Sequence, residues 1–480
     1  MLDEVPGFNE TRPDASNGGM NGIKDMTAAL QWVHDNGDAL GADLDKVTVF
    51  GESAGSIATS TLAQSPPAAG LFQRGIFMSG TVTSPYWGNG GPQLGRDAMR
   101  LTLPEIAGQP FDKLSLEALQ ELPGNYFVPY GLLGSGYVDG VVVPFCEDAA
   151  TNEAVGGCPM ERYLEGKVHV DAVITSATSV DGTSPWEDYY STTGPLIPSG
   201  GDNVAYEEAL DNWWAEMASA YGPGANVPTG AEVAKTYPLS DFDDQATPAF
   251  MQADGDACVA CPSLKVGRIL ADLGVQTWNM AFEYGASTDD VGAEAGLYQA
   301  VDPDVQSDGW ATHTADILWA FDATRGGPDP LDFSTTSAPL IDEWSAGRQA
   351  LVEGMQNAYG SFARGENPTP PAGLGAASWP KVDGSGGVAD QSVMVFDAPA
   401  AALVTGYRAE VCEWWGSHNS TARALQARVA EPWVRKAGGG AGAEGGAAGA
   451  AVETERFICV SQRHDRHNNS SRTTSKRRPS

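Results

Sequence analysis

The stretch "KVTVFGESAGSIATSTL", residues 46–62, decides the fold of this chain. Its β-branched beginning predicts a strand over 46–50, and the small and helix-forming residues of 54–65 predict a helix immediately afterwards. Between them, "GESAG" fits the pattern Gly-x-Ser-x-Gly, in which a strained serine stands exposed at the carboxyl end of a strand. We expect Gly51 and Gly55 to be required, because side chains there would collide with the strand and the helix around Ser53.

Other segments alternate between the two kinds of pattern. Further apolar, β-branched runs predict strands over 74–80, 170–177, 276–284 and 392–397. Apolar residues at helical spacing predict helices within 22–36, 203–222 and 338–365. Strands separated by helices and long excursions predict an α/β fold with a central, mostly parallel sheet flanked by helices.

Length and composition limit the classes of function. The 480 residues are 42% hydrophobic and include 13 tryptophans, which is enough to bury a substantial core. A net charge of −34 argues against a nucleic-acid partner, because the phosphate backbone would be repelled. No apolar run reaches about 18 residues, so we expect no membrane span, and "MLDEVPGFNE" (1–10) has no signal-peptide pattern. The oligomeric state cannot be predicted from these features.

The end of the chain differs in composition from the rest. From residue 436 it is rich in Gly and Ala and then basic and polar, so it cannot bury a core. We expect one α/β domain over 1–435 and a disordered tail over 436–480.

The cysteines and glycan acceptors favour an oxidising compartment. Cys146 and Cys158 bracket a short loop that suits a disulfide worth about 3 kcal/mol. "CVAC" at 258–261 has the spacing of half a zinc site, but no second pair with suitable histidines lies near it, so we expect no zinc there. With the possible glycan acceptors Asn9 and Asn419, this favours a secreted or secretory-pathway glycoprotein.

A serine becomes a good nucleophile only when a histidine accepts its proton and an acid holds that histidine. In a strand–serine–helix architecture the acid and the histidine follow the serine in that order. Of the six histidines, His34 precedes the serine, His169 leaves little room for an acid before it, and two lie in the tail. This leaves His313 and His418, and His313 opens an apolar segment after a loop. Asp181 follows a predicted buried strand and is the candidate acid, although the local Asp-Gly pair by itself favours an ordinary turn.

Several segments together resemble the type-B carboxylesterase family, the serine hydrolases that include cholinesterases and fungal lipases. They are "ALQWVHDNGDALGADLDKVTVFGESAGS", "FMSGTVTSPYW", "GYVDGVVVP", "THTADILWAF", "NPTPPAGLGAASWPKVD" and "YRAEVCEWW", within roughly residues 7 to 416. The resemblance implies an α/β-hydrolase fold with Ser53 as nucleophile, Asp181 as acid and His313 as base. It also implies that Glu52 and Asp316 lie around the site, and that Cys261 and Cys412 form a disulfide.

The chain departs from the family pattern in two places. The family usually has a glutamate where this chain has Asp181, so the shorter side chain requires its loop to lie closer to His313. The family's glycine-rich oxyanion loop has no counterpart in the 52 residues before Ser53. The backbone N–H of Ala54 remains as one donor; one such donor is worth about 2.7–4 kcal/mol. We therefore expect a fragment of a longer esterase, without its N-terminal strands.

These observations predict hydrolysis of small-molecule carboxylic esters through an acyl-enzyme, without a metal or an organic cofactor. Two alternatives stay open at this point. One is a catalytically impaired fragment or a protein-binding module of the adhesion type, which the family includes on the same fold. The other is a lipase that acts on lipid droplets, which would need an apolar lid that the family places upstream of the serine.

Overall fold

The computed structural model describes residues 20–84, 110, 113, 138–147, 157–182, 206–212, 227–285, 310–321 and 346–418. The chain divides into two units, Met1–Ala430 and Glu431–Ser480, and the described residues all belong to the first. The predicted tail, 436–480, and the predicted glycan acceptors Asn9 and Asn419 lie outside the described residues.

A six-stranded sheet forms the centre of the described part of the chain. Its strands follow each other in chain order: β1 (Thr48–Glu52), β2 (Arg74–Met78), β3 (Ala172–Thr178), β4 (Gln276–Phe282), β5 (Ser392–Phe396) and β6 (Ala402–Thr405). Neighbouring strands from β1 to β5 are parallel, and β6 is antiparallel to β5. The predicted mostly parallel sheet is therefore confirmed, and β1 continues two residues further than expected, into the Gly-Glu of the motif.

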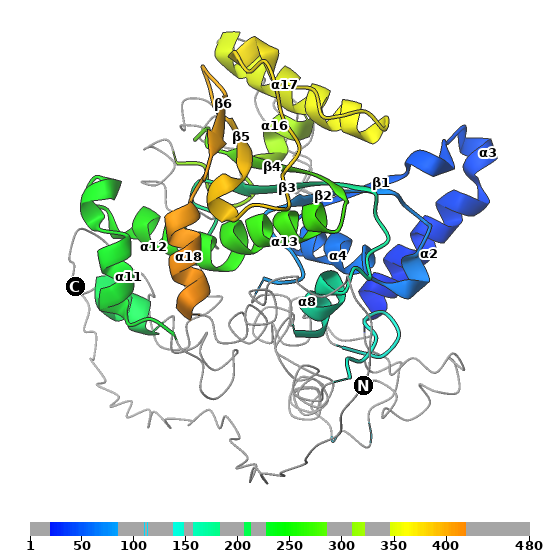
Figure 1. The fold of residues 1–480 in the computed structure, drawn as a ribbon, viewed down its shortest axis with the longest axis horizontal. Coiled ribbons are helices and arrows are strands. Elements are labelled where there is room, and N and C mark those ends of the chain that lie inside the picture. Colours follow the sequence, from blue (N-terminus) through cyan, green and yellow to red (C-terminus); the bar gives the residue numbers. More distant parts are fainter. Residues whose placement is uncertain are drawn as a thin grey trace, which may run out of the picture. The chain divides into compact units, whose positions relative to one another are not determined.

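Helices cover both faces of this sheet (Figure 1). The longer ones are α2 (Asn21–Asp35), α4 (Ala54–Leu62), α8 (Gly157–Leu164), α12 (Ala246–Gly255), α13 (Cys261–Asp272), α17 (Ala346–Ala363) and α18 (Ala409–His418). The shorter ones are α3 (Gly37–Leu40), α11 (Gly230–Thr236), α16 (Ile317–Phe321) and η9 (Asp256–Ala260), a π-helical turn. Short 3₁₀ turns complete the described elements: η2 (Leu44–Lys46), η3 (Pro66–Ala68), η8 (Leu239–Phe242), η11 (Ala372–Leu374) and η12 (Val388–Asp390).

The side chains of the central strands are buried on both faces, as parallel strands between two helical layers require. Every residue of β3 is buried. On one face the strands pack against α16 and α17 through a cluster that includes Met78, Ile174, Trp278, Phe282, Trp319, Leu351, Met355 and Phe362. On the other face they pack against α4, α8 and α13 through a cluster that includes Leu62, Phe77, Tyr163, Val173, Val266 and Ile269.

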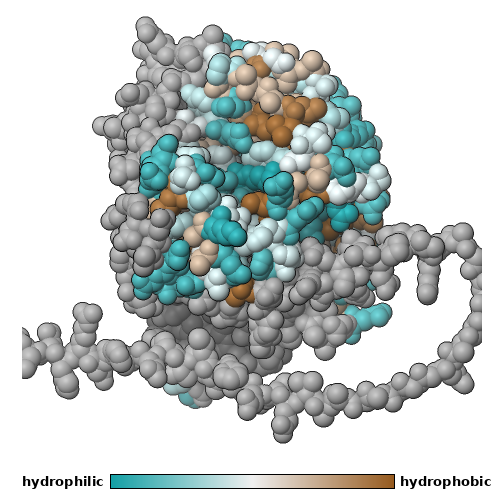
Figure 2. Space-filling view, turned by 60° about the vertical axis from the view of Figure 1, so that its left-hand side comes forward, coloured by the Kyte–Doolittle hydropathy of each residue, from teal (hydrophilic) through white to brown (hydrophobic). Residues whose placement is uncertain are grey.

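Among the described strands, β1 lies at one edge of the sheet. Its Phe50 is 52% exposed and packs against Phe321, with 5.3 Å between the ring centroids. Figure 2 shows one face of the molecule, where hydrophilic residues are mixed with small hydrophobic groups. None of the helices in the described ranges is both long and apolar enough to cross a membrane.

Two disulfides link segments around the sheet. Cys146 bonds to Cys158, 12 residues away, and Cys261 bonds to Cys412, 151 residues away. Both predicted pairs are therefore confirmed, the first expected from its short loop and the second from the family resemblance. The longer one joins the start of α13 to α18.

Candidate active site

Ser53 occupies the sharp turn between β1 and α4. Its backbone has φ 57° and ψ −119°, a region that L-residues rarely adopt, so the turn is strained. Its N–H donates to the carbonyl of Met78, 2.9 Å away, and its own carbonyl accepts the first hydrogen bond of α4 from Ile57, at 3.0 Å. These bonds fix the serine at the carboxyl end of β1.

The glycine before the turn makes this geometry possible. A Cβ at Gly51 would lie 2.2 Å from the carbonyl oxygen of Gly55, so only glycine fits there. Within the described part of the chain, a Cβ at Gly55 would meet no atom within 4 Å. The expectation that a side chain at Gly55 would collide is thus not met, because the crowding arises where the backbone of Gly55 approaches Gly51.

His313 comes from a loop that lies beside the end of β3. Thr312 forms an isolated parallel bridge with Val180, which holds this loop against the residues that follow β3. The Nε2 atom of His313 lies 2.8 Å from Ser53 Oγ, and its Nδ1 atom lies 2.6 Å from Asp181 Oδ1. The structure thus brings the three predicted site residues into one continuous hydrogen-bonded chain.

Asp181 is completely buried, and its loop is held at several points. Its Oδ2 atom accepts a hydrogen bond from the N–H of Thr178 at 2.8 Å, which leaves Oδ1 for the histidine. On either side, Val180 N–H donates to the carbonyl of Ala311 and Gly182 N–H donates to that of Met251, both at 2.9 Å. The aspartate therefore reaches His313 because its loop is bound closely to neighbouring segments.

Two more carboxyl groups surround the imidazole. Glu52 Oε1 lies 3.5 Å from His313 Nε2, and Asp316 is fully buried. Burial raises the pKa of Glu52 and raises that of Asp316 well above its ordinary value. Burial disfavours the charged imidazole, but the neighbouring carboxylates outweigh it, so the pKa of His313 is raised. The site therefore stabilises a positive charge on the ring.

The interior next to these groups is polar. The carboxyl oxygens of Asp316 and the hydroxyl oxygen of Ser79 are buried and have no hydrogen-bond partner within the described part of the chain, and Ser176 is buried beside them. Ser79 N–H donates to the carbonyl of Ser176 at 3.0 Å, so Ser79, directly after β2, lies beside Ser176 in β3. Neither serine is among the predicted site residues, since each falls within a predicted strand (74–80 or 170–177) and carries no pattern of its own.

The remaining predicted residues occupy distinct positions. Ala54 is exposed and is the first residue of α4, where backbone N–H groups have no partner within the helix. His418, the other candidate histidine, lies at the end of α18, with its Nδ1 atom 2.9 Å from the carbonyl of Trp414. It takes no part in the chain that contains Ser53.

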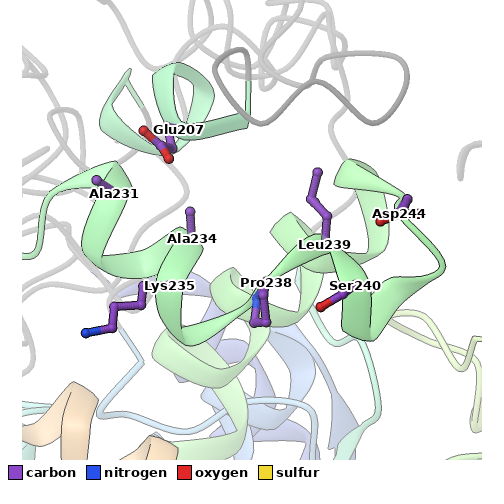
Figure 3. A pocket seen from close by; sticks show the side chains of 8 residues that line it. All are labelled: Glu207, Ala231, Ala234, Lys235, Pro238, Leu239, Ser240 and Asp244. Carbon is purple, nitrogen blue, oxygen red and sulfur yellow. The ribbon is translucent and has the colours of Figure 1, made fainter.

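In the described ranges, no group of three or more His, Cys, Asp or Glu side chains could hold a metal ion. A pocket of about 340 Å³ lies elsewhere, along α11 and the segment after it (Figure 3). Its lining consists of Glu207, Ala231, Ala234, Lys235, Pro238, Leu239, Ser240 and Asp244. None of these residues belongs to the hydrogen-bonded chain of the candidate site.

A mostly parallel sheet between helical layers, with Gly-x-Ser-x-Gly at a strand–helix turn, defines an α/β-hydrolase fold. Residues 5–99 match the model of the Carboxylesterase family. Carboxylesterase 3 of Homo sapiens and that of Pongo abelii are each 28% identical over 390 residues, which cover 78% of this chain and 59% of each relative. Para-nitrobenzyl esterase of Bacillus subtilis is 52% identical over 73 residues, 15% of this chain and 14% of the relative. The chain is thus similar to carboxylesterases, and it spans about three fifths of the length of the relatives it matches over 390 residues.

Proposed function

We propose that this protein hydrolyses carboxylic esters of small molecules through an acyl-enzyme, with Ser53 as nucleophile. The observation that carries the proposal is the chain from Ser53 Oγ to His313 Nε2, at 2.8 Å, and from His313 Nδ1 to Asp181 Oδ1, at 2.6 Å. Both distances suit proton transfer and orientation of the base. The names of the relatives, carboxylesterase and para-nitrobenzyl esterase, support esters as the substrate class.

In the first step, Ser53 Oγ attacks the carbonyl carbon of the ester while His313 Nε2 accepts its proton. The resulting imidazolium is stabilised by the buried carboxylate of Asp181, which also holds the ring in the required orientation. The backbone N–H of Ala54, at the positive end of α4, is the donor we assign to the oxyanion. The bond to the leaving oxygen then breaks, and the imidazolium protonates the departing alcohol.

In the second step, water attacks the acyl carbon and gives its proton to His313. The bond to Ser53 Oγ breaks, the serine regains the proton, and the carboxylic acid leaves. The intact set of nucleophile, base and acid favours this enzyme over a protein-binding module on the same fold. The two disulfides further support a protein of the secretory pathway or the cell exterior.

A fluorophosphonate probe, which reacts with activated serines, tests the proposal directly. The protein should be labelled covalently at Ser53, and Ser53→Ala should abolish the labelling. Ser417→Ala is the matched control, because Ser417 is an exposed serine on α18 and not part of the site. A folded protein that is not labelled, or whose labelling survives Ser53→Ala, would refute the proposed function.

A further inference from the structure

Arg408 connects three segments beneath the candidate site. It directly precedes α18 and has a positive φ of 55°, and its side chain is 11% exposed. One guanidinium nitrogen, Nη1, pairs with Asp256 Oδ1, and the other, Nη2, donates to the carbonyl oxygen of Ser179. Asp256 belongs to η9, and Ser179 directly follows β3, two residues before Asp181.

Asp256 is fixed from its other side. It is completely buried, and its Oδ2 atom accepts a hydrogen bond from the Tyr237 hydroxyl at 3.0 Å. The indole N–H of Trp415 donates to that same hydroxyl at 2.7 Å. A buried carboxylate with these partners gives Arg408 a rigid anchor, so the direction of its second nitrogen toward Ser179 is defined.

Ser179 in turn contacts the histidine loop. Its hydroxyl donates to the carbonyl of Ala311, 3.2 Å away, and accepts the N–H of Ala311 at 3.1 Å. Ala311 lies two residues before His313, just as Ser179 lies two residues before Asp181. The carbonyl of Ser179 therefore binds the arginine while its hydroxyl binds the loop of the base.

We propose that Arg408 is a positioning residue of the esterase site: by holding the Ser179 carbonyl against Asp256, it keeps the carboxylate of Asp181 within hydrogen-bond distance of His313. This inference rests on the proposed function. The arginine acts through the backbone of the acid loop, since its guanidinium contacts Asp256 and Ser179 rather than the histidine.

The loop of Asp181 needs this support from Arg408 because its aspartate side chain is shorter than the glutamate that is usual in the family. An aspartate reaches one methylene less far than a glutamate, so a small retreat of its loop breaks the 2.6 Å contact to His313. A guanidinium can serve two acceptors in fixed directions at once, whereas a lysine ammonium is a single point charge. The long disulfide supports the same geometry, because Cys412 N–H donates to the Arg408 carbonyl at 2.9 Å and Cys261 directly follows η9.

Arg408→Lys tests the inference, since lysine retains the charge opposite Asp256 but has one nitrogen in place of the two that bind Asp256 and the Ser179 carbonyl. We expect kcat for a p-nitrophenyl ester to fall about 10- to 100-fold with KM unchanged, the size that misplacement of a catalytic group produces. The rising limb of the kcat/KM profile should move to lower pH, because a loosened Asp181 stabilises the imidazolium less. A purely structural role would leave this limb in place. Arg364→Lys is the control, because Arg364 forms an exposed ion pair with Glu366.

The outcomes separate the two proposals. If the wild type is not labelled by the fluorophosphonate, the proposed function fails. If the wild type is labelled and hydrolyses the ester, but folded Arg408→Lys keeps kcat within twofold and the same pH limb, the inference on Arg408 fails. Should Arg408→Lys not fold, the double variant Arg408→Gln/Asp256→Asn removes both buried charges together, so that neither charge is left buried without its partner. A tenfold loss of kcat in that variant would support the inference, and unchanged kcat would overturn it.

Discussion

The carboxylate of Glu52 lies 3.5 Å from the Nε2 atom of His313, the same nitrogen that lies 2.8 Å from Ser53 Oγ. A negative charge at that distance favours the protonated imidazole, and the pKa of His313 is accordingly raised. A general base must be neutral before it accepts a proton, so kcat/KM should increase with pH through this raised pKa. In the proposed mechanism, the pair therefore sets the pH above which His313 can accept the proton of Ser53.

Glu52→Gln should therefore move the rising limb of the kcat/KM profile to lower pH. The amide keeps the size of the side chain but removes the charge, so less free energy stabilises the imidazolium. We expect a shift of about one pH unit, equivalent to ~1.4 kcal/mol. Glu353→Gln, on the exposed side of α17, serves as control and should leave the limb in place. If the rising limb of the Glu52→Gln profile lies at the same pH as that of the wild type, the charge of Glu52 does not determine the pKa of His313.

Two substitutions at Asp181 should distinguish the effect of its charge from the effect of its side-chain length. Asp181→Asn keeps the shape but loses the charge and favours the wrong tautomer of His313, so under the proposed mechanism kcat should fall on the order of 10⁴, the loss known for this change in a Ser-His-Asp triad. Asp181→Glu restores the residue that is usual in the family. It should still lower kcat about tenfold, because the added methylene must fit in a fully buried loop whose backbone is fixed at Val180 and Gly182.

Kinetics with a p-nitrophenyl ester would measure both changes, with circular dichroism to establish folding. Asp171→Asn provides the control, since Asp171 is an exposed aspartate just before β3. If the kcat of Asp181→Glu equals or exceeds that of the wild type, the loop of Asp181 is more flexible than its hydrogen bonds indicate.

The sequence predicted those parts of the fold that depend on local pattern. The strands β2 to β5 are buried, so their β-branched and aromatic runs were recognisable. The edge strand β6 was missed, because it has four largely exposed residues and pairs through antiparallel contacts that no pattern indicates. Ser53 was recognisable because the strand, the turn and the helix all leave local signals.

Contacts between segments that are far apart in the chain could not be predicted from local sequence patterns. The pairing of Asp181 with His313 joins residues 132 positions apart, and only the order of residues and the family resemblance indicated it. Arg408 and Asp256, 152 positions apart, carried no local signal for their ion pair. Gly55 shows the opposite error, since the pattern predicted a collision there, whereas a Cβ at Gly55 would meet no atom within 4 Å among the described residues and the crowding lies at Gly51.

The two disulfides should differ in their effect on stability. In the chain-entropy model, the link that closes 151 residues contributes about 5 kcal/mol, and the link that closes 12 contributes about 3 kcal/mol. Replacing Cys261 and Cys412 by serine should therefore lower the free energy of unfolding more than replacing Cys146 and Cys158. Urea unfolding of the two double variants measures the difference. A larger loss from the shorter loop would indicate that strain or local packing, rather than loop length, dominates.

The turn at Ser53 offers a matched pair of glycine substitutions. Gly51→Ala places a methyl group 2.2 Å from the carbonyl oxygen of Gly55, so either the strand or the helix must shift. We expect a loss of about 3 kcal/mol or more in the free energy of unfolding, together with loss of probe labelling at Ser53.

Gly55→Ala differs from that variant only in position. Its methyl group meets no atom within 4 Å among the described residues, and alanine is the better helix former by about 1 kcal/mol. This variant should therefore unfold at the same or a slightly higher urea concentration than the wild type. Equal destabilisation by both substitutions would contradict the assignment of the crowding to Gly51. A stable Gly51→Ala variant that keeps its labelling would show that the turn can form without the close backbone approach seen between β1 and α4.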